Sequence, residues 1–420
     1  MAVLTNAPRG TGDTLPSESY LLRKVENEMI EIAENFGFKE IRTPTFEHTE
    51  LFNRSVGDTT DVVQKEMYTF LDKGNRSITL RPEGTAGALR AVIEHGLLNE
   101  AMPLKVYYLL SCFRYEKPQA GRLREFHQFG VEMLGSQSPL ADAEVITLAD
   151  TLLRKLGVSD ARLEINSLGC KNCRPEYQKK LISYFEGKKE ELCETCRGRL
   201  NKNPLRILDC KSPVCKEISK NAPKVSEFLC DECSNHFEGV KKALDESSVS
   251  WHFNPDIVRG LDYYNKTVFE FVSSSLGAQS TVCGGGRYDG LTAQLGGADV
   301  PSLGFGLGIE RLFLLYKKAH PELEIPAPMI YIASIGEEAA VKALSICGDL
   351  RKKGIYAECD TVGRGLKAQM KYADKKGAIF SVVLGSDEIA ENKAVIKNMK
   401  TGETKETALC EIYEAIVKGE

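Results

Sequence analysis

The chain has 420 residues, of which 42% are apolar and 27% are charged, and its formal net charge is −4. Because a typical domain spans roughly 100 to 200 residues, this length predicts two or three domains with a large core. The charge excludes a uniformly basic nucleic-acid-binding protein, so any such binding depends on local patches. The chain has neither a signal-like stretch in "MAVLTNAPRGTGD" nor a run of about 18 apolar residues, which indicates a cytoplasmic protein without a membrane span.

The longer, N-terminal part of the chain predicts strands that follow one another with few helices between them. Apolar residues in 17–36 recur every three or four positions, as in an amphipathic helix. The stretch "FKEIRTPTFEH" alternates like a strand, although Pro44 lacks the amide donor that a central strand needs. Further predicted strands cover 77–80, 105–113, 126–133, 267–272 and 301–306, and predicted helices cover 84–95, 141–156 and 309–318. This order favours an α+β fold, with an antiparallel sheet flanked by helices.

Two stretches interrupt this series. The proline-rich "HPELEIPAP" is a linker candidate that divides the chain into 1–325 and 326–420. After it, apolar strands at 330–335, 355–359 and 379–384 alternate with helices at 337–353 and 366–376, which is typical of a small α/β domain. The cysteine-rich stretch at about 170–250 is also rich in lysine and glutamate, and we interpret it as an insertion into the first domain.

Charged residues gather in strands that otherwise look buried. The segment "CFRYEKPQAGRLREFHQFGVE" is one example, and the glycine-containing segments "TLRPEGT", "VRGLDYY", "CGGGRYDGL" and "GFGLGIER" are others. Each alone is weak evidence, because glycines mark turns and most arginines are surface cations. Together they place six arginines on predicted strands: Arg81, Arg114, Arg122, Arg259, Arg287 and Arg311. Planar guanidinium suits phosphate, and the lack of Walker or Rossmann spacing favours a phosphate site on the antiparallel sheet itself.

These motifs resemble those of the class II aminoacyl-tRNA synthetases and, within that class, the histidyl-tRNA synthetases. The segments "FKEIRTP", "FRYEKPQAGRLREFHQFGVE" and "GFGLGIERL" are similar to the three class motifs, and "RGLDYYNKTVFEF" and "GGGRYDGL" to the two segments peculiar to the histidine enzymes. The resemblance covers nearly the whole chain, and the "HIGH" and "KMSKS" signatures of the other class are missing. It implies an antiparallel class II sheet with an inserted subdomain and a C-terminal α/β anticodon-binding domain.

The resemblance also implies ATP-dependent ligation of L-histidine to tRNA(His) through a histidyl-adenylate intermediate, with release of AMP and pyrophosphate. By this likeness Arg114 and Arg259 are catalytic residues that bind ATP at the α-phosphate, and Arg311 also binds the nucleotide. Mg²⁺ would hold the leaving pyrophosphate. Fixed cations suit this step, because charge builds on the α-phosphate while the attacking carboxylate is already a competent nucleophile.

For the amino acid, the likeness implies two groups of contacts and a wall. Glu83, Thr85 and Gln128 resemble the residues that bind the α-ammonium group, Glu132 and Tyr264 those that hold the imidazole, and Tyr263 and Tyr288 those that wall the pocket. Strand alternation also puts Glu132 on the same face as Gln128. Without the neighbouring "RGLD", packing within the sheet would be the simpler interpretation of the tyrosine pair.

The expected partners are tRNA(His), L-histidine, ATP and a second copy of the chain, since the first motif is a dimer element in this class. In 326–420, Lys367, Lys371 and Lys375 recur at helical spacing. Such a stripe is ordinarily a solvated face, but the likeness to an anticodon-binding domain favours contact with tRNA phosphates. Two alternatives stay open: a non-catalytic relative similar to the regulatory subunit of ATP phosphoribosyltransferase, and a zinc-stabilised nucleic-acid-binding module with an inactive site.

Eight of the 13 cysteines lie in the insertion, between Cys170 and Cys233. Without an export signal, reduced thiols are expected rather than disulfides. The spacing C-x2-C-x19-C-x2-C would serve a structural Zn²⁺ at Cys170, Cys173, Cys193 and Cys196, and a second set would be Cys210, Cys215, Cys230 and Cys233. The family resemblance implies no metal there, so structural zinc and buried free thiols both stay open.

Overall fold

The computed structural model describes residues 5–57, 60, 62–201, 203–208, 210, 212–259, 261, 263–279, 281–322 and 325–417. The chain forms two compact units, Met1–Leu323 and Glu324–Glu420, and each has its own hydrophobic core. Among the described helices, none is long and apolar enough to cross a lipid bilayer.

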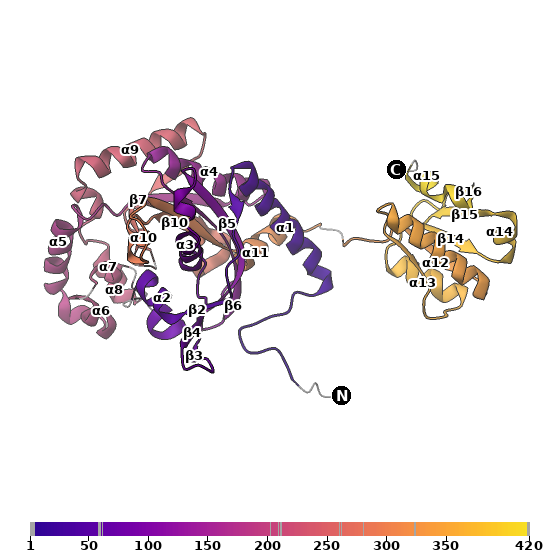
Figure 1. Cartoon of the computed structure of the whole chain (residues 1–420), viewed down its shortest axis with the longest axis horizontal. Coiled ribbons are helices and arrows are strands. Elements are labelled where there is room, and N and C mark those ends of the chain that lie inside the picture. The colour runs from indigo at the N-terminus through magenta and orange to yellow at the C-terminus, as the bar shows by residue number, and fades with distance from the viewer. Residues whose placement is uncertain are drawn as a thin grey trace. The chain divides into compact units, whose positions relative to one another are not determined.

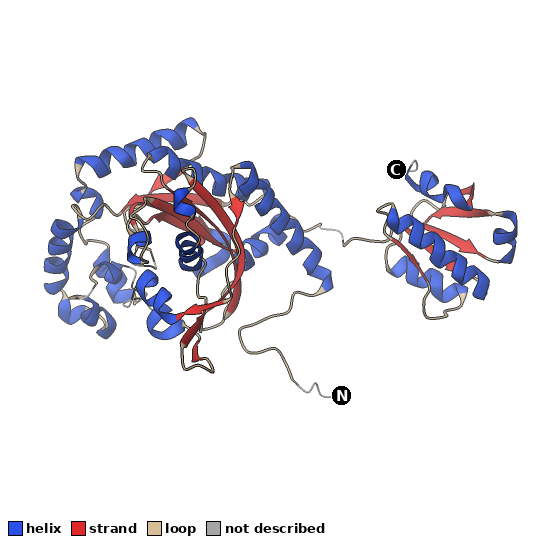
Figure 2. Ribbon diagram, in the orientation of Figure 1, coloured by secondary structure: helices blue, strands red, loops and turns tan. Residues whose placement is uncertain are grey.

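The first unit is built on an eight-stranded sheet (Figures 1 and 2). Across this sheet the strands run in the order β1 (Lys39–Glu40), β5 (Leu104–Phe113), β6 (Glu125–Leu134), β11 (Ser302–Gly308), β10 (Thr281–Arg287), β9 (Asn265–Ser273), β7 (Ala161–Ser167) and β8 (Trp251–Phe253). Neighbouring strands are antiparallel, except that the edge pairs β1–β5 and β7–β8 are parallel. The predicted antiparallel sheet with flanking helices is thereby confirmed.

Strand β6 shows how the sheet separates a core face from a site face. Phe129 and Val131 are buried in the main core of the unit. The helices that contribute to this core are α1 (Pro16–Asn35), α4 (Pro139–Lys155), α9 (Asp231–Glu246) and α11 (Ile309–Ala319). Because successive side chains of a strand alternate, Gln128, Gly130 and Glu132 belong to the opposite face. That face carries the candidate site.

A small second sheet and two helices border the site face. The sheet has the order β2 (Phe46–His48), β4 (Ser77–Leu80), β3 (Thr69–Leu71), and the helices nearby are α2 (Thr49–Val56) and α3 (Thr85–Glu94). The sequence predicted one strand through "FKEIRTPTFEH", but the structure divides it into β1 and β2, which belong to different sheets. Pro44 lies between them, and its missing amide donor explains why the ladder cannot continue.

The cysteine-rich stretch forms a helical insertion between β7 and β9, with the short strand β8 after it. Its helices are α5 (Arg174–Glu186), α6 (Glu194–Arg199), α7 (Leu205–Leu208), α8 (Pro213–Ser219) and α9, with short 3-10 turns between α5 and α6 and between α8 and α9, and they gather at the left of Figure 1. Helix α9 packs into the core face, whereas α5 to α8 share a second core with Tyr263, Tyr264 and Tyr288. The insertion is thus packed against the site face.

The second unit has a five-stranded sheet of its own. The strand order is β13 (Ala357–Cys359), β12 (Ile330–Ser334), β14 (Phe380–Leu384), β15 (Lys393–Asn398), β16 (Thr404–Ala408), and the helices are α12 (Glu337–Lys352), α13 (Leu366–Lys375), α14 (Ser386–Glu391) and α15 (Ile412–Val417). The first three strands pair in parallel and the last two antiparallel. The predicted strands β12, β13 and β14 and helices α12 and α13 are present. Strands β15 and β16 and helices α14 and α15 are present in addition to the predicted elements.

Candidate active site

A cavity of about 680 Å³ lies over the site face of the eight-stranded sheet. Most of the residues expected at the site line it: Glu83, Thr85, Arg114, Gln128, Arg259, Tyr263, Tyr264 and Arg311. The insertion contributes a further wall, made of Cys193, Thr195, Arg199, Arg206, Cys210 and Ser212. Of the expected residues, Glu132 and Tyr288 are buried behind this lining. The volume is in the range of cavities that hold small-molecule substrates.

A row of glycines crosses three adjacent strands of the sheet, and Gly284 and Gly306 of this row line the cavity. Gly130 pairs with Gly306, and Gly306 pairs with Gly284. A Cβ atom at Gly284 would overlap the guanidinium of Arg259, and one at Gly306 would overlap the amide of Gln128. The glycines of "CGGGRYDGL" and "GFGLGIER" therefore leave room for site side chains to lie flat on the sheet.

Arg259 is held over this glycine row by a carboxylate from the next strand. Its guanidinium forms an ion pair with Glu270, whose other oxygen accepts a hydrogen bond from Thr281 Oγ1 at 2.8 Å. The guanidinium carbon also lies 5.4 Å from the ring centre of Tyr264, which is a cation–π contact. Burial lowers the pKa of Arg259, but the Glu270 carboxylate and Tyr264 together outweigh burial and raise it. Arg259 is thus a fixed positive charge at the cavity.

Arg114 comes from the end of β5, on the other side of the glycine row. Its Nε donates to the Pro82 carbonyl at 2.8 Å, and its guanidinium lies 5.3 Å from the ring centre of Phe126. A weaker ion pair at 3.8 Å links it to Glu116. These contacts orient the guanidinium and leave further donors of its fork available to an anion, since arginine carries five.

Arg311 extends from the start of α11 and is fixed by backbone carbonyls. Its Nε donates to the Gly121 carbonyl at 3.0 Å and its Nη1 to the Thr281 carbonyl at 2.7 Å. Burial lowers the pKa of Arg311, and the neighbouring cations Arg122 and Arg114 lower it further. Several guanidinium groups crowded into one cavity repel one another, so an anion such as a polyphosphate would be stabilised there.

The expectation that Arg81 and Arg287 contribute to the phosphate site is wrong. Arg81 donates to the backbone carbonyls of Ser111 at 2.6 Å and Thr43 at 2.8 Å, so it joins segments of the fold. Arg287 is fully buried and forms an ion pair with Asp142. Neither side chain is part of the cavity lining. Both are structural arginines.

Three polar residues form one end of the cavity, at the start of α3. The Glu83 carboxylate accepts hydrogen bonds from the backbone amides of Thr85 and Ala86, both at 2.8 Å. Gln128 Oε1 accepts from the amide of Gly84 at 2.9 Å. Burial raises the pKa of Glu83, although the two amides and a nearby arginine oppose this effect. A carboxylate and an amide oxygen side by side suit a positively charged ammonium group.

A second polar group lies deeper, around Glu132. One oxygen of Glu132 accepts from Tyr108 Oη at 3.0 Å, and the other accepts from the hydroxyl of Tyr288. Burial raises the pKa of Glu132 to about 8. The ring of Tyr263 lies 4.6 Å from that of Tyr264 and 5.5 Å from that of Tyr288. Aromatic rings and a carboxyl group with a raised pKa thus surround one buried spot.

Sequence reasoning missed three residues that support the site. Glu310 lines the cavity and accepts hydrogen bonds from His127, from its backbone amide at 2.9 Å and from Nδ1 at 2.8 Å. Glu270 holds Arg259, and Tyr108 holds Glu132. A signal existed for two of them, since Glu310 directly precedes Arg311 and Glu270 interrupts the apolar run "VFEFV".

The cavity also offers oxygen ligands that fit Mg²⁺. Five carboxylates line it: Glu66, Glu83, Glu116, Glu270 and Glu310. Mg²⁺ is bound in nucleotide sites by one or two carboxylates together with phosphate oxygens and water. The donor set of the cavity is therefore compatible with a magnesium–nucleotide complex.

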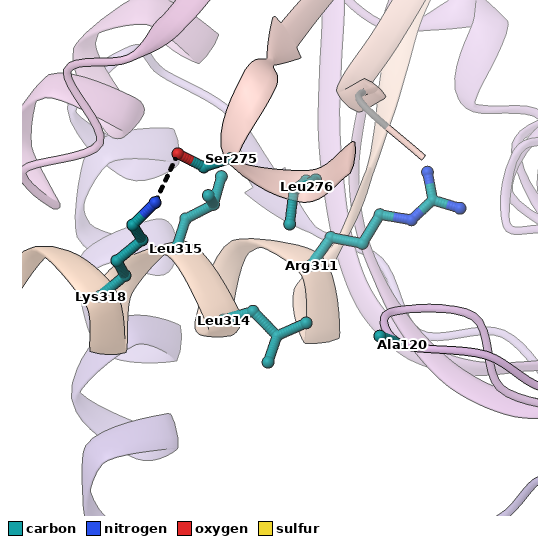
Figure 3. Close-up of a pocket in the computed structure, with 7 residues that line it drawn as sticks. All are labelled: Ala120, Ser275, Leu276, Arg311, Leu314, Leu315 and Lys318. Atoms are coloured by element: carbon teal, nitrogen blue, oxygen red, sulfur yellow. Dashed lines mark hydrogen bonds between the residues drawn. The ribbon is translucent and has the colours of Figure 1, made fainter. Parts of the chain in front are cut away.

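A smaller cavity of about 210 Å³ lies beside α11 (Figure 3). Lys318 Nζ donates to Ser275 Oγ at 2.8 Å on one side of it, and Leu276, Leu314 and Leu315 supply its apolar lining. The aliphatic stem of Arg311 borders this cavity while its guanidinium points away from Lys318. Arg311 thus lines both cavities, and its aliphatic stem is the part that borders the smaller one.

The cysteines of the insertion form two groups, but not in the predicted sets. The outer group is Cys170, Cys173, Cys230 and Cys233, and the inner group is Cys193, Cys196, Cys210 and Cys215. Within each group the sulfur atoms all lie within 4.8 Å of one another, so each group could hold a metal ion. The predicted sets took the first four and the last four of these cysteines in chain order. They are wrong, because the chain folds back and brings Cys230 and Cys233 to Cys170 and Cys173.

Comparison with known proteins identifies both units. The family model described as "Histidyl-tRNA synthetase" matches residues 10–312, and the model described as "Anticodon binding domain" matches residues 329–419. A solved histidyl-tRNA synthetase from S. aureus has 39% sequence identity and a TM-score of 0.84, and the match covers 98% of this chain and 100% of that chain. A structure from Bacillus halodurans C, titled as an ATP phosphoribosyltransferase regulatory subunit/histidyl-tRNA synthetase, has only 22% identity and a TM-score of 0.65, which shows a shared fold alone.

Curated relatives have higher identity. A histidine–tRNA ligase of Acetivibrio thermocellus is 54% identical over 97% of this chain and 98% of its own length. A histidine–tRNA ligase of Caldanaerobacter subterraneus is 54% identical over 99% of this chain and the whole of its own length. With a family model matched over most of the first unit and relatives matched from end to end, the chain belongs to the histidyl-tRNA synthetase family.

Proposed function

We propose that this protein ligates L-histidine to tRNA(His) in an ATP-dependent reaction that passes through histidyl-adenylate. Membership of the family supports this function. The structural observation that carries it is the convergence of Arg114, Arg259 and Arg311 in one cavity with the polar end at Glu83 and Gln128. An anionic polyphosphate and a cationic amino acid would each find a complementary part of this cavity.

In the first step, the histidine carboxylate attacks the α-phosphorus of ATP, and pyrophosphate leaves. We propose that Arg259 and Arg114 bind the α-phosphate from opposite sides of the glycine row. Both are oriented before substrate arrives, by Glu270 and by the Pro82 carbonyl respectively. Preorganised cations stabilise charge that develops in the transition state without reorganising at that moment. Arg311 would bind the nucleotide, and Mg²⁺ would neutralise the phosphates of the leaving group.

For the amino acid, we propose that Glu83, Thr85 and Gln128 bind the α-ammonium group. Glu132 and Tyr264 would hold the imidazole. An ionised carboxylate has about four lone-pair sites and a protonated one adds an O–H donor, so in either form Glu132 can accept from its two tyrosine partners and still bond to a ring nitrogen. Tyr263 and Tyr288 would complete the wall, and the hydroxyl of Tyr288 would also keep Glu132 in place.

The second step transfers the histidyl group to a terminal ribose hydroxyl of tRNA(His). We propose that residues 1–325 carry both chemical steps and that residues 326–420 bind the anticodon arm. The lysines Lys367, Lys371 and Lys375 are all exposed on α13, where they would contact tRNA phosphates. We also propose a homodimer, because the first class motif forms the dimer interface in this class, and action in the cytoplasm, where charged tRNA is used.

We propose Zn²⁺ as the metal of the two cysteine groups. Four thiolates favour Zn²⁺ among abundant divalent ions, because hard ions such as Mg²⁺ and Ca²⁺ prefer oxygen. Sulfur atoms within 4.8 Å of one another are compatible with four ligands of one tetrahedral ion.

The rival function is a non-catalytic regulatory subunit with the same fold. It would not need a preorganised arginine at Arg259 or the polar end at Glu83. The test is histidine-dependent exchange of labelled pyrophosphate into ATP by the purified chain. Exchange that requires histidine, and that other amino acids do not support, is the expected result. A folded protein without such exchange would exclude the proposed function.

A further inference from the structure

We infer that the insertion is a two-zinc module, in which the outer group fastens the ends of the insertion and the inner group builds one wall of the catalytic cavity. This rests on the proposed function only in calling that cavity catalytic. The observations that carry it are the arrangement of the sulfur atoms, the backbone amides directed at them, and the place of each group in the fold.

The sulfur atoms are spaced like the ligands of a tetrahedral zinc ion. Cys170 Sγ lies 3.8 Å from Cys173 Sγ and 3.9 Å from Cys230 Sγ, and Cys193 Sγ lies 3.8 Å from Cys210 Sγ. Zinc–thiolate bonds of about 2.3 Å in a tetrahedron separate neighbouring sulfurs by about 3.8 Å. A disulfide would bring two sulfurs to about 2.0 Å, so the observed spacing fits a shared ion and not covalent pairs.

Backbone amides stabilise the sulfur atoms in both groups. Four amides donate to sulfur at 3.2 to 3.5 Å: Asn172 to Cys170, Cys230 to Cys173, Cys193 to Cys215 and Ser212 to Cys210. The outer contacts that orient metal ligands are therefore present in each group.

The outer group joins the two ends of the helical insertion beside the proposed histidine pocket. Cys170 and Cys230 are 60 positions apart in the chain, yet their sulfurs are in contact. Arg174, next to Cys173, donates to the carbonyl of Tyr264, and Lys266 Nζ donates to Glu232 at 2.8 Å. A metal at the outer group would hold the base of the insertion against the strand that follows Tyr264.

The inner group forms part of the cavity itself. Cys193 and Cys210 line the cavity, and so do Arg199 and Arg206 on the short helices α6 and α7. Helices of four to seven residues are not stable alone, because forming the first turn costs more than so few hydrogen bonds return. A structural metal supplies folding free energy to such segments. Zinc at the inner group would therefore fix two cavity-lining arginines opposite the sheet.

The assignment of the eight cysteines to an outer and an inner group can be tested by measuring the zinc content of the full-length protein, purified without chelators. Wild type should contain two zinc ions per chain, and Cys193→Ser/Cys196→Ser and Cys170→Ser/Cys173→Ser should contain one each. Cys170→Ser/Cys230→Ser should also keep one, since both residues belong to the outer group. If the first four and the last four cysteines formed the two groups instead, Cys170 and Cys230 would belong to different groups, and that variant would lose both ions. Cys410→Ser, at an exposed cysteine of the second unit, is the control and should keep two. Zinc below about a fifth of an equivalent in wild type, or loss of both ions from Cys170→Ser/Cys230→Ser, overturns the proposal.

The role of the inner group is tested by activity. Loss of its zinc should lower kcat/KM for histidylation of tRNA by about tenfold or more, as removal of supporting groups commonly does at metal sites. If the serine variant fails to fold, wild-type protein stripped by a chelator and reloaded with Zn²⁺ gives the same readout, and activity should fall and return. Charging within about twofold of wild type after loss of the inner zinc overturns the role of this group. Wild type that holds two zinc ions but shows no histidine-dependent exchange would reject the proposed function and leave the two-zinc module standing.

Discussion

The guanidinium of Arg259 lies over Gly284, in the space that a Cβ atom at position 284 would occupy. Gly284 pairs with Glu270 on the neighbouring strand, and Glu270 forms the ion pair with Arg259. The strand register therefore sets both the room for Arg259 and the partner that orients it. The absence of a side chain at Gly284 and the carboxylate of Glu270 on the neighbouring strand together position the guanidinium of Arg259, the proposed catalytic charge.

Gly284→Ala should disable the first step while leaving the fold intact. The atoms that the new methyl group would meet belong to the far end of the Arg259 side chain, so the arginine is displaced and the sheet is not. We expect the rate of histidine-dependent pyrophosphate exchange to fall about 10²-fold or more, as when a transition-state donor is lost. Gly348→Ala on α12 is the control, because a Cβ atom added there would meet no atom of another described segment within 4 Å. A folded Gly284→Ala variant with exchange within a few-fold of wild type would show that the position of Arg259 does not matter.

Tyr264→Phe should weaken histidine binding and leave ATP binding almost unchanged. The substitution removes the hydroxyl proposed for the imidazole but keeps the ring that contacts Arg259. A site built around buried hydrogen bonds rejects ligands that cannot pair with it by about 10⁴-fold, so wild type should also discriminate strongly against phenylalanine. Michaelis constants from pyrophosphate exchange measure both effects. Equal rises in the constants for histidine and ATP would make Tyr264 a packing residue.

Glu132→Gln should flatten the pH dependence of stability. Burial raises the pKa of Glu132 to about 8, whereas an unfolded glutamate titrates near 4.3. Between these values the native state holds a proton that the unfolded state has released, so the free energy of unfolding falls as pH rises. Glutamine has no such proton, and the wild-type slope should exceed that of the variant by up to about 1.4 kcal/mol per pH unit. Urea unfolding at about pH 5, 6.5 and 8 gives the two slopes, and parallel curves would contradict the prediction.

Asp142→Ala should destabilise the first unit strongly. Asp142 accepts from Arg287, which is fully buried, and lies 3.3 Å from Nε2 of His236 on α9. Removing one partner of a buried ion pair leaves an uncompensated charge, at a cost of about 3 to 5 kcal/mol. Asp150→Ala, which breaks an ion pair with the exposed Arg154 on the same helix, should cost less than about 1 kcal/mol. Equal shifts in the urea midpoints of the two variants would contradict this difference.

Lys367→Ala/Lys371→Ala/Lys375→Ala should weaken tRNA binding without affecting adenylate formation. All three lysines are exposed on α13, and the salt dependence of binding should decrease with each phosphate that is no longer neutralised. We expect the slope of log K against log salt to become shallower by about two. Lys342→Ala/Lys352→Ala, at exposed lysines of α12, is the control. A variant with the wild-type slope would remove the stripe from the proposed interface.

The sequence was informative where local pattern decides the structure. Apolar periodicity located α1, α4 and α12, and alternation placed Gln128 and Glu132 on one face of β6. Family motifs led to most of the residues that line the cavity. The alternation "KAVIKN" of β15 was also visible and was overlooked.

Other features depend on contacts between distant parts of the chain. Arg81 and Arg287 stand in motifs as suggestive as that of Arg259, but their partners at Ser111 and Asp142 are set by neighbouring segments. The grouping of the cysteines likewise follows from how the insertion folds back, which spacing alone does not encode. The role of Tyr108 behind Glu132 needs strand register, since both residues come from adjacent strands.

Strands β7 and β9 pair directly with each other, although the whole helical insertion lies between them in the chain. The sheet therefore places no requirement on the length of that excursion, because its two ends meet wherever the intervening chain goes. Residues could be gained or lost between the ends without shifting the hydrogen-bond register of the catalytic strands. The register of the catalytic strands is therefore independent of the length of the insertion, whereas α9 and the cavity-lining residues of the insertion are tied to the core and to the site.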